Sequence, residues 1–502
     1  DARPGASLML LATPILLPLG TAILLFLLRR HPVHKLLSVI SAGVLVIVGA
    51  AILASTVANG PMAAQMGGWA APYGITLAAD TLSGAMVLIA GIAAFTALMF
   101  ATVEVDEATD RLGFHALAHS MTGGVCGAFL TGDLFNLYVW FEVMLISSFG
   151  LLVIGGGRRQ MDGAMKYVAL NLVGTIAFLT GVGLLYGTAG TLNMADLGAK
   201  LQGRMDETAV MGAAGMLLFA FAAKAALFPV FFWLPASYHT PAAATSALFS
   251  ALLTKVGVYS LLRVFTLIFD PGNEVVATAL LVAAGFTIAL GAIGAAAEGE
   301  MRRIFSFHIV SQIGVMTLGL AIGTKLALTG AIFYFFHHIP AMMGLILLGG
   351  LIGRECGSER LERLGSLWTA GPWLGILFLI PMLSLIGVPP FSGFWAKFLM
   401  IRASFEAGDF IFGALILLAS VLTFFYLGRV FVAAFWQPRP GLEGDAVPAC
   451  YPHRLLVVPV MLLAVVTLAI SLWPGNFFAL ADGAAGGLLD PAPYLGTVLG
   501  GQ

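Results

Sequence analysis

Runs of about 20 apolar residues recur along the whole chain, and they constrain its fold more than any other feature. A helix rises about 1.5 Å per residue, so each run is long enough to cross a hydrocarbon core of roughly 30 Å. Of the 502 residues, 60% are hydrophobic and only 10% are charged, a composition outside the range of soluble domains. The sequence therefore predicts an integral membrane protein embedded in a lipid bilayer.

The apolar runs indicate helices and not the strands of a barrel. They are continuous and rich in Leu, Ala, Gly and Val, whereas barrel strands have about ten residues in strict alternation. We expect an all-α protein with about fourteen spans. These spans are 7–28, 34–58, 80–103, 113–131, 134–155, 163–187, 209–228, 243–268, 274–297, 302–323, 326–352, 371–388 with 392–406, 410–435 and 454–474.

Lysine and arginine in the short loops favour one orientation. If the first helix begins outside, most loop cations fall inside, where positive charge accumulates. The inner set includes Arg29, Arg30, Lys35, Arg111, Arg158, Arg159, Arg302, Arg303, Arg354, Arg360, Arg363, Arg439 and Arg454. The outer set is Arg3, Lys200, Arg204 and Lys325, with Arg402 at its edge. We expect an even number of spans with both termini outside, and we interpret the first apolar run as a span and not a signal peptide, because it lacks a small-residue cleavage site.

Composition and motifs exclude several classes of function. A net charge of −1 gives no basic excess for binding nucleic acid. Cys126, Cys356 and Cys450 are far apart and have no CxxC spacing, so neither an iron–sulfur cluster, a zinc site nor a disulfide framework is expected. Nucleotide-binding and hydrolase motifs are absent in a fitting context. We expect no cofactor.

Three lysines lie in apolar surroundings from which they cannot easily reach water. Lys224 and Lys255 lie within 208–263, and Lys397 follows the pair Pro389 and Pro390. An ammonium in hydrocarbon costs several kcal/mol on insertion scales, so such residues indicate function. Two spans are broken by proline beside these lysines, one at Pro229 and one at Pro389 and Pro390. Such breaks are typical of transporters built from inverted repeats.

A single carboxylate, Glu142, lies deep in the span 134–155. It follows Asp133 by nine residues, or about 13.5 Å along a helix, which places it near the bilayer midplane. Lys224 is its natural partner, because opposite charges stabilise each other in this environment. The pair either pins two helices together or takes part in function.

Lys255 also lies near mid-depth, and it has no carboxylate nearby in sequence. Desolvation disfavours the charged form of a lysine, so Lys255 can give up a proton reversibly near neutral pH. The alternative is a lysine solvated in a narrow water cavity without proton exchange. Arg263, two turns farther along, is expected to extend toward the membrane interface.

Histidines continue this series of titratable residues. His308 lies in 302–323, and His337 and His338 lie in 326–352. Histidine can pass a proton between its ring nitrogens, and adjacent helical residues point about 100° apart, so His337 and His338 cannot share one role. His115 and His119 have metal-like spacing but no third ligand, so no metal site is expected.

Several stretches resemble the D subunits of the multisubunit cation/proton antiporters, the Mrp family. The stretches are GAFLTGDLFNLYVWFE, GTLNMADL, KAALFPVFFWLPASYHT, SFHIVSQIG, AIFYFFHH and SLIGVPPFSGFWAKF. They span about 120–400, and they are also similar to antiporter-like subunits of respiratory complex I and membrane-bound hydrogenases. GTLNMADL and FHIVSQIG favour the antiporter branch.

The resemblance implies fourteen helices with two inverted five-helix repeats, formed by spans 4–8 and 9–13, and with helices 7 and 12 broken. The implied organisation is N-terminal helices 1–3 in 1–112, the first repeat in 113–270, the second in 271–440, and helix 14 with a tail in 441–502. The implied proton pathway consists of Glu142, Lys224, Lys255, His308, His338 and Lys397. The accessory candidates are His337, Asp133 and His239.

The resemblance further implies a subunit of a hetero-oligomer in a bacterial cell membrane, exchanging protons for a monovalent cation such as Na⁺. One departure lies after His338, where relatives commonly carry a lysine. This chain has Met342 at roughly that place, after Pro340. Two alternatives remain: a proton-pumping subunit of a redox-driven complex, and a structural subunit that no longer transports.

Overall fold

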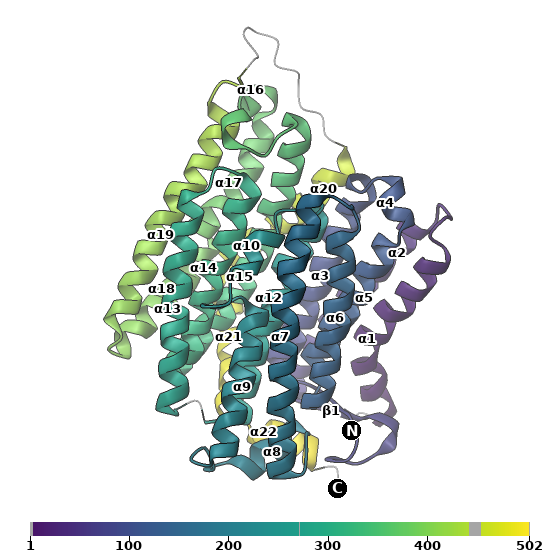
Figure 1. Cartoon of the computed structure of the whole chain (residues 1–502), viewed down its shortest axis with the longest axis vertical. Coiled ribbons are helices and arrows are strands. Elements are labelled where there is room, and N and C mark those ends of the chain that lie inside the picture. Colours follow the sequence, from purple (N-terminus) through teal and green to yellow (C-terminus); the bar gives the residue numbers. More distant parts are fainter. Residues whose placement is uncertain (1–3, 271, 441–452, 501–502) are drawn as a thin grey trace.

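The computed structural model describes residues 4–270, 272–440 and 453–500. It is a bundle of long helices packed side by side, and the described residues contain a single two-stranded sheet (Figure 1). Twelve helices in the described part are long and apolar enough to cross a membrane. The predicted all-helical membrane fold is confirmed.

The N-terminal part consists of three long helices and a hairpin. Its elements are α1 (Pro4–Leu27), α2 (His34–Asn59), β1 (Met62–Gln65), a 3₁₀ turn (Met66–Gly68), β2 (Thr76–Ala79) and α3 (Thr81–Glu104). The strands are antiparallel, with Met62 opposite Ala79. The hairpin lies at the end of the bundle where α8 (Met194–Leu201) and α22 (Ala492–Leu499) also lie (Figure 1). We call this end the terminal face, and α4 (Glu107–Arg111) and α16 (Leu367–Ala370) lie at the opposite face (Figure 1).

The middle of the chain contains the first broken helix. Its elements are α4 (Glu107–Arg111), α5 (Phe114–Leu130), α6 (Leu134–Val153), α7 (Arg158–Ala189), α8, α9 (Thr208–Ala225), α10 (Trp233–Ser237), α11 (Ala243–Leu248), the π-helix η2 (Phe249–Leu253) and α12 (Thr254–Leu267). α11, η2 and α12 form one continuous span.

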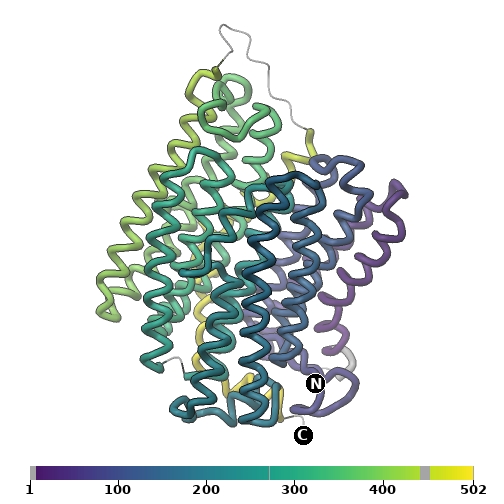
Figure 2. The backbone as a smooth tube through the Cα atoms, viewed as in Figure 1, coloured from purple at the N-terminus to yellow at the C-terminus, as the bar shows by residue number. Residues whose placement is uncertain are grey.

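The remaining elements carry the second break and the C-terminal helices. They are α13 (Glu274–Ala297), α14 (Met301–Ile322), α15 (Lys325–Cys356), η3 (Leu361–Arg363), α16 (Leu367–Ala370), α17 (Pro372–Ile386), α18 (Ser392–Glu406), α19 (Phe410–Phe431), η4 (Val432–Trp436), α20 (Arg454–Leu472), α21 (Pro474–Leu489) and α22. Figure 2 shows the chain progressing across the bundle from purple to green, with the yellow C-terminal segment lying against its middle.

The two expected breaks are present. α9 ends at Ala225, before Pro229, and α17 ends at Ile386, before Pro389 and Pro390. The residues that end these helices, Ala226 and Gly387, have φ values of 64° and 91°, so the chain leaves each helix through a left-handed residue. Proline cannot donate to a helix, which explains why neither helix continues.

The element count differs in detail from the expected fourteen spans. α5 has 17 residues, and α17 and α18 have 15 each, so these expected spans are not among the twelve long helices.

The proposed repeats stay a prediction. The final segment, expected to be one helix and a tail, instead contains α20, α21 and α22, and α20 and α21 pack on α15. The expected segment boundary at 440/441 lies outside the described residues.

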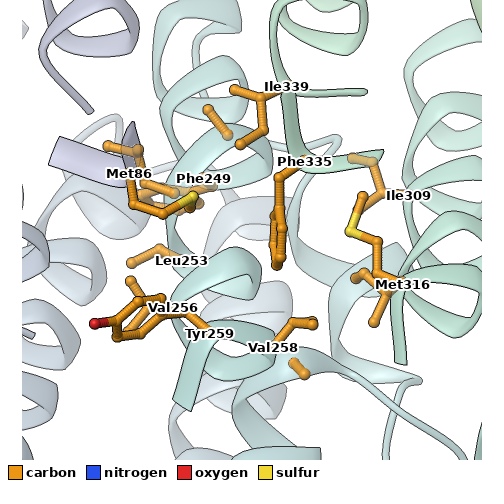
Figure 3. Packing of buried hydrophobic residues seen from close by; sticks show 14 of the residues in the cluster. Met86, Phe249, Leu253, Val256, Val258, Tyr259, Ile309, Met316, Phe335 and Ile339 are labelled. Carbon is orange, nitrogen blue, oxygen red and sulfur yellow. The ribbon is translucent and has the colours of Figure 1, made fainter. Parts of the chain in front are cut away.

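Three spans form the interior of the bundle. The apolar windows of the α11–α12 span and of α15 are completely buried and that of α14 is 94% buried, against 33% for α2 and α7. Figure 3 shows apolar side chains packed around this interior, among them Val258, Ile309 and Phe335. Small residues bring the backbones together, since a Cβ built on Gly257 of α12 would lie 2.5 Å from the backbone nitrogen of Ala225 in α9.

Candidate functional site

Glu142 of α6 and Lys224 of α9 lie in the same region without forming an ion pair. Glu142 Oε1 accepts a hydrogen bond of 2.7 Å from the Thr175 hydroxyl of α7. Lys224 Nζ lies 5.6 Å from the ring centroid of Phe141, the neighbour of Glu142. No ion pair within 4.0 Å joins the two residues in the described chain. The expected partnership is therefore a near approach and not a fixed contact.

Side chains from elsewhere satisfy the backbone at the break after Lys224. The indole of Trp233 donates to the Ala223 carbonyl at 3.0 Å. The hydroxyl of Thr287 in α13 accepts from the Phe228 N–H at 2.8 Å. Lys224 thus occupies the last turn of a helix whose end is held by α10 and α13, as an interrupted span requires.

Lys255 lies fully buried at the start of α12, with 0% of its surface exposed. Its Nζ donates to the carbonyl of Ser250 at 2.7 Å, and Ser250 lies in the π-helix η2. A π-turn widens the helix and alters its carbonyl pattern, so a side chain can reach one of these carbonyls. No carboxylate forms an ion pair with Lys255 among the described residues, which leaves a carbonyl dipole as its partner.

His308 and His338 form a stacked pair between α14 and α15. Their ring centroids are 5.7 Å apart and their planes differ by 22°. His308 Nδ1 lies 2.6 Å from the Tyr426 hydroxyl of α19. His308 Nε2 and both ring nitrogens of His338 have no hydrogen-bond partner in the described chain. A buried ring nitrogen without a protein partner is available to exchange a proton.

His337 faces a different group of residues from His338. Its Nδ1 lies 2.9 Å from the Ser392 hydroxyl and 3.3 Å from that of Ser384. Ser384 belongs to α17 and Ser392 begins α18, so His337 contacts both halves of the second broken helix. The predicted divergence of the two adjacent histidines agrees with this geometry.

Lys397 is the last of the candidate pathway residues. It lies in α18, with 6% of its surface exposed. Its Nζ donates to the carbonyls of Leu385 and Ile386 at 3.0 and 2.9 Å. These carbonyls end α17, where the break leaves them without helical donors. The lysine therefore satisfies the helix end, and the helix end in turn favours its charge.

α15 continues as one helix through Pro340, and Met342 is 1% exposed. The described residues contain no hydrogen bond between Lys255 and either His308 or His338. A proton passing between these groups would need a water molecule as a bridge.

Two of the accessory candidates, Asp133 and His239, lie outside the helices themselves, before α6 and between α10 and α11. Asp133 caps α6, where its carboxylate accepts from the Asn136 N–H at 2.8 Å, and burial raises the pKa of its carboxyl. His239 lines a polar cavity of about 320 Å³ together with Arg302 and Glu359. Burial lowers the pKa of its imidazole.

His115 and His119 share a serine partner. The Ser38 hydroxyl lies 2.9 Å from His115 Nδ1 and 3.0 Å from His119 Nε2. Asp110 lies nearby, 2.8 Å from His34 and 3.8 Å from His115. The described chain contains no group of three or more residues that could hold a metal ion.

Arg263 lies toward the terminal face, but its side chain is buried there and does not extend into solvent as expected. Arg263 is 5% exposed and pairs with Asp80 at 2.7 Å. Asp80 lies 183 residues away in sequence, so no local pattern pairs the two. Thr175 and Tyr426 were missed for the same reason, because single hydroxyls in apolar spans carry no distinctive signal.

Comparisons with known proteins place the chain among transport proteins. The family model described as "NADH:quinone oxidoreductase/Mrp antiporter, TM" matches residues 131–423. The chain is 38% identical to the D subunit of the Na⁺/H⁺ antiporter of Alkalihalophilus pseudofirmus, over 98% of this chain and 99% of that protein.

Two solved structures are similar over nearly their whole length. A chain of the Mrp complex from Dietzia sp. DQ12-45-1b has a TM-score of 0.90 and 30% identity, and the match covers 97% of this chain and 99% of that one. A chain of an archaeal membrane-bound sulfane sulfur reductase has a TM-score of 0.91 and 26% identity, with the same coverage.

Proposed function

Because the chain belongs to the NADH:quinone oxidoreductase/Mrp antiporter transmembrane family, on the branch of the antiporter D subunits, we propose that it moves protons in exchange for Na⁺. It works as a multi-pass membrane subunit of a hetero-oligomeric complex and is not an enzyme. The observation that supports this most directly is the buried array of titratable side chains in adjacent central helices, formed by Lys255, His308, His338 and Lys397.

Each group in the array can hold a proton and release it. Lys255 and Lys397 donate to backbone carbonyls, which stabilise the ammonium without fixing it as a countercharge would. His308 and His338 lie between the two lysine-bearing helices and present unpaired ring nitrogens. In the proposed path a proton passes from Lys255 through this pair to Lys397, with water bridging the gaps.

Glu142 and Lys224 lie at the start of this path, where the proton affinity of Lys224 depends on its distance from Glu142. In the described arrangement Glu142 is held by Thr175 and makes no ion pair with Lys224. Two unit charges at 4 Å attract by about 4 kcal/mol at an effective dielectric of 20. Moving one charge across 100 mV takes about 2.3 kcal/mol. Closing or opening this pair therefore changes the proton affinity of Lys224 by an energy comparable with that of a membrane potential.

We propose that the terminal face is the outer side of the membrane. α1 begins and α22 ends there (Figure 1), while Arg302, Arg360 and Arg363 line a cavity at the opposite face. This asymmetry agrees with the accumulation of positive charge on inner loops. We also propose that 113–270 and 271–440 are the two inverted repeats, with 1–112 and 441–502 as flanking helices. Each proposed repeat contains one broken helix.

A redox-driven proton pump is the second candidate. Its support is the similarity to the chain of the sulfane sulfur reductase, an archaeal respiratory membrane complex. The higher identity to antiporter subunits favours exchange. Identifying the subunits that copurify with this chain separates the two, because a redox-driven complex brings redox cofactors.

The test is Na⁺/H⁺ exchange by the whole complex in vesicles. Lys224→Ala and Glu142→Ala are expected to abolish exchange in an assembled complex. Lys325→Ala is the matched control, because Lys325 is 54% exposed and pairs with Asp482 at the surface. Near-normal exchange in either test variant would contradict the assignment.

A further inference from the structure

α12 carries a second row of polar residues that leads away from Lys255. Tyr259 and Arg263 follow Lys255 at intervals of four residues, so the three share one face of the helix. Arg263 lies about 12 Å beyond Lys255 along the axis, toward the terminal face. Figure 3 shows the Tyr259 hydroxyl directed away from Phe335 of α15.

Arg263 is held by a two-pronged ion pair. Its Nη1 lies 2.7 Å from Asp80 Oδ2, and its Nη2 donates to Asp80 Oδ1 at 2.8 Å. Asp80 is 8% exposed and caps α3, where it accepts from the N–H and hydroxyl of Ser83. The guanidinium is thus fixed between two spans.

Two aromatic rings enclose the guanidinium. Its carbon lies 5.5 Å from the ring centroid of Tyr259 and 5.3 Å from that of Tyr494. Tyr494 belongs to α22, the last helix of the described chain. Tyr259 is itself anchored, because its hydroxyl donates to the Phe129 carbonyl at 2.8 Å. The C-terminal helix therefore covers the ion pair at the terminal face.

A cavity begins one turn beyond Arg263. It has a volume of about 560 Å³ and lies among α8, the end of α12 and the start of α22. Its lining includes Gln202, Thr266, Asp270 and Asp490. Thr266 follows Arg263 by three residues, so the cavity lies farther along α12 from Lys255 than the ion pair does.

A guanidinium suits a barrier better than a relay. Arginine keeps its charge at all relevant pH values and cannot hand on a proton as lysine can. Asp80 balances the charge of Arg263, so the pair closes this row of polar residues by its direct hydrogen bonds and its burial, and not by a net positive field. Two neutral amides bind each other less strongly than this charged pair, so they would let water enter the row.

We propose that the ion pair of Arg263 with Asp80, covered by Tyr259 and Tyr494, is a closed, buried barrier that separates Lys255 from the terminal face. The barrier makes a proton on Lys255 continue toward α14 and α15, and so prevents uncoupled leakage. This inference rests on the proposed role of Lys255 in proton transfer.

The test is passive proton leakage in vesicles that contain the whole complex, with an imposed pH gradient and no Na⁺. Removal of one charge alone would leave the other buried and unpaired, which is strongly destabilising. The test variant is therefore Asp80→Asn with Arg263→Gln, which neutralises both groups and leaves a hydrogen-bonding amide at each position. Its matched control is Arg204→Gln with Glu207→Gln, an exposed pair joined at 2.7 Å.

The neutralised variant is expected to leak protons several-fold faster than the control, and adding Lys255→Ala is expected to return leakage to the control rate. Unchanged leakage in an assembled complex would overturn the barrier. Leakage that persists after Lys255→Ala would also overturn it, because protons would then be crossing through a packing defect. Exchange by Lys255→Ala alone tests the proposed function separately, since intact exchange contradicts that function whatever the leakage shows.

Discussion

The imidazole rings of His308 and His338 are stacked with their centroids 5.7 Å apart. They come from different helices, α14 and α15, and both are fully buried. Three of the four ring nitrogens have no partner among the described residues, and such burial is unfavourable unless the nitrogens bind water or serve a function. We therefore expect water at these nitrogens, as the proposed path between Lys255 and Lys397 requires.

Tyr426→Phe removes the hydroxyl that lies 2.6 Å from His308 Nδ1 and keeps the ring. We expect Na⁺/H⁺ exchange to fall by up to about tenfold, because one hydrogen bond contributes about 0.5–1.5 kcal/mol and this one orients the imidazole. Tyr186→Phe is the control, since Tyr186 is 58% exposed. Equal activity of the two variants would show that the hydroxyl does not orient a working histidine.

Lys397→Arg keeps the positive charge of the second buried lysine but not its chemistry. We expect exchange to be lost, because a guanidinium does not release its proton and its planar group does not match the carbonyls of Leu385 and Ile386. Arg402→Lys, in the same helix and 55% exposed, should leave exchange unchanged. Wild-type exchange by Lys397→Arg would remove Lys397 from the path.

Gly257→Ala tests the close contact between α12 and α9. The added Cβ would lie 2.5 Å from the Ala225 nitrogen, so the helices must separate, and we expect a loss of about 1–3 kcal/mol in stability. The measurement is the thermal unfolding of the purified complex. Gly183→Ala in α7 is the control, since nothing lies within 4 Å of its Cβ. Equal unfolding temperatures would contradict the contact.

Local chemistry made part of this architecture predictable. The breaks at Pro229 and at Pro389 and Pro390 follow from a missing backbone donor, and the buried positions of Lys255 and Lys397 follow from the apolar runs around them. Partners distant in sequence were not predictable. Thr175 lies 33 residues from Glu142, and Tyr426 lies 118 residues from His308.

Arg263 is the clearest example of a residue whose partner could not be predicted from the sequence. Its position two turns beyond Lys255 favoured a side chain that extends toward the membrane interface. The structure instead pairs it with Asp80, a helix cap in another part of the chain. The π-helix that provides the Ser250 carbonyl to Lys255 was also missed, since nothing in FSALL distinguishes it from an ordinary helical turn.

The central claim is that protons cross the interior through Lys255. Its most direct test is Na⁺-driven proton movement in vesicles that contain the assembled complex with Lys255→Ala, compared with Lys200→Ala, whose lysine is 44% exposed. The account predicts that exchange is abolished in Lys255→Ala and retained in Lys200→Ala. Equal exchange by the two variants, at equal amounts of assembled complex, would contradict it.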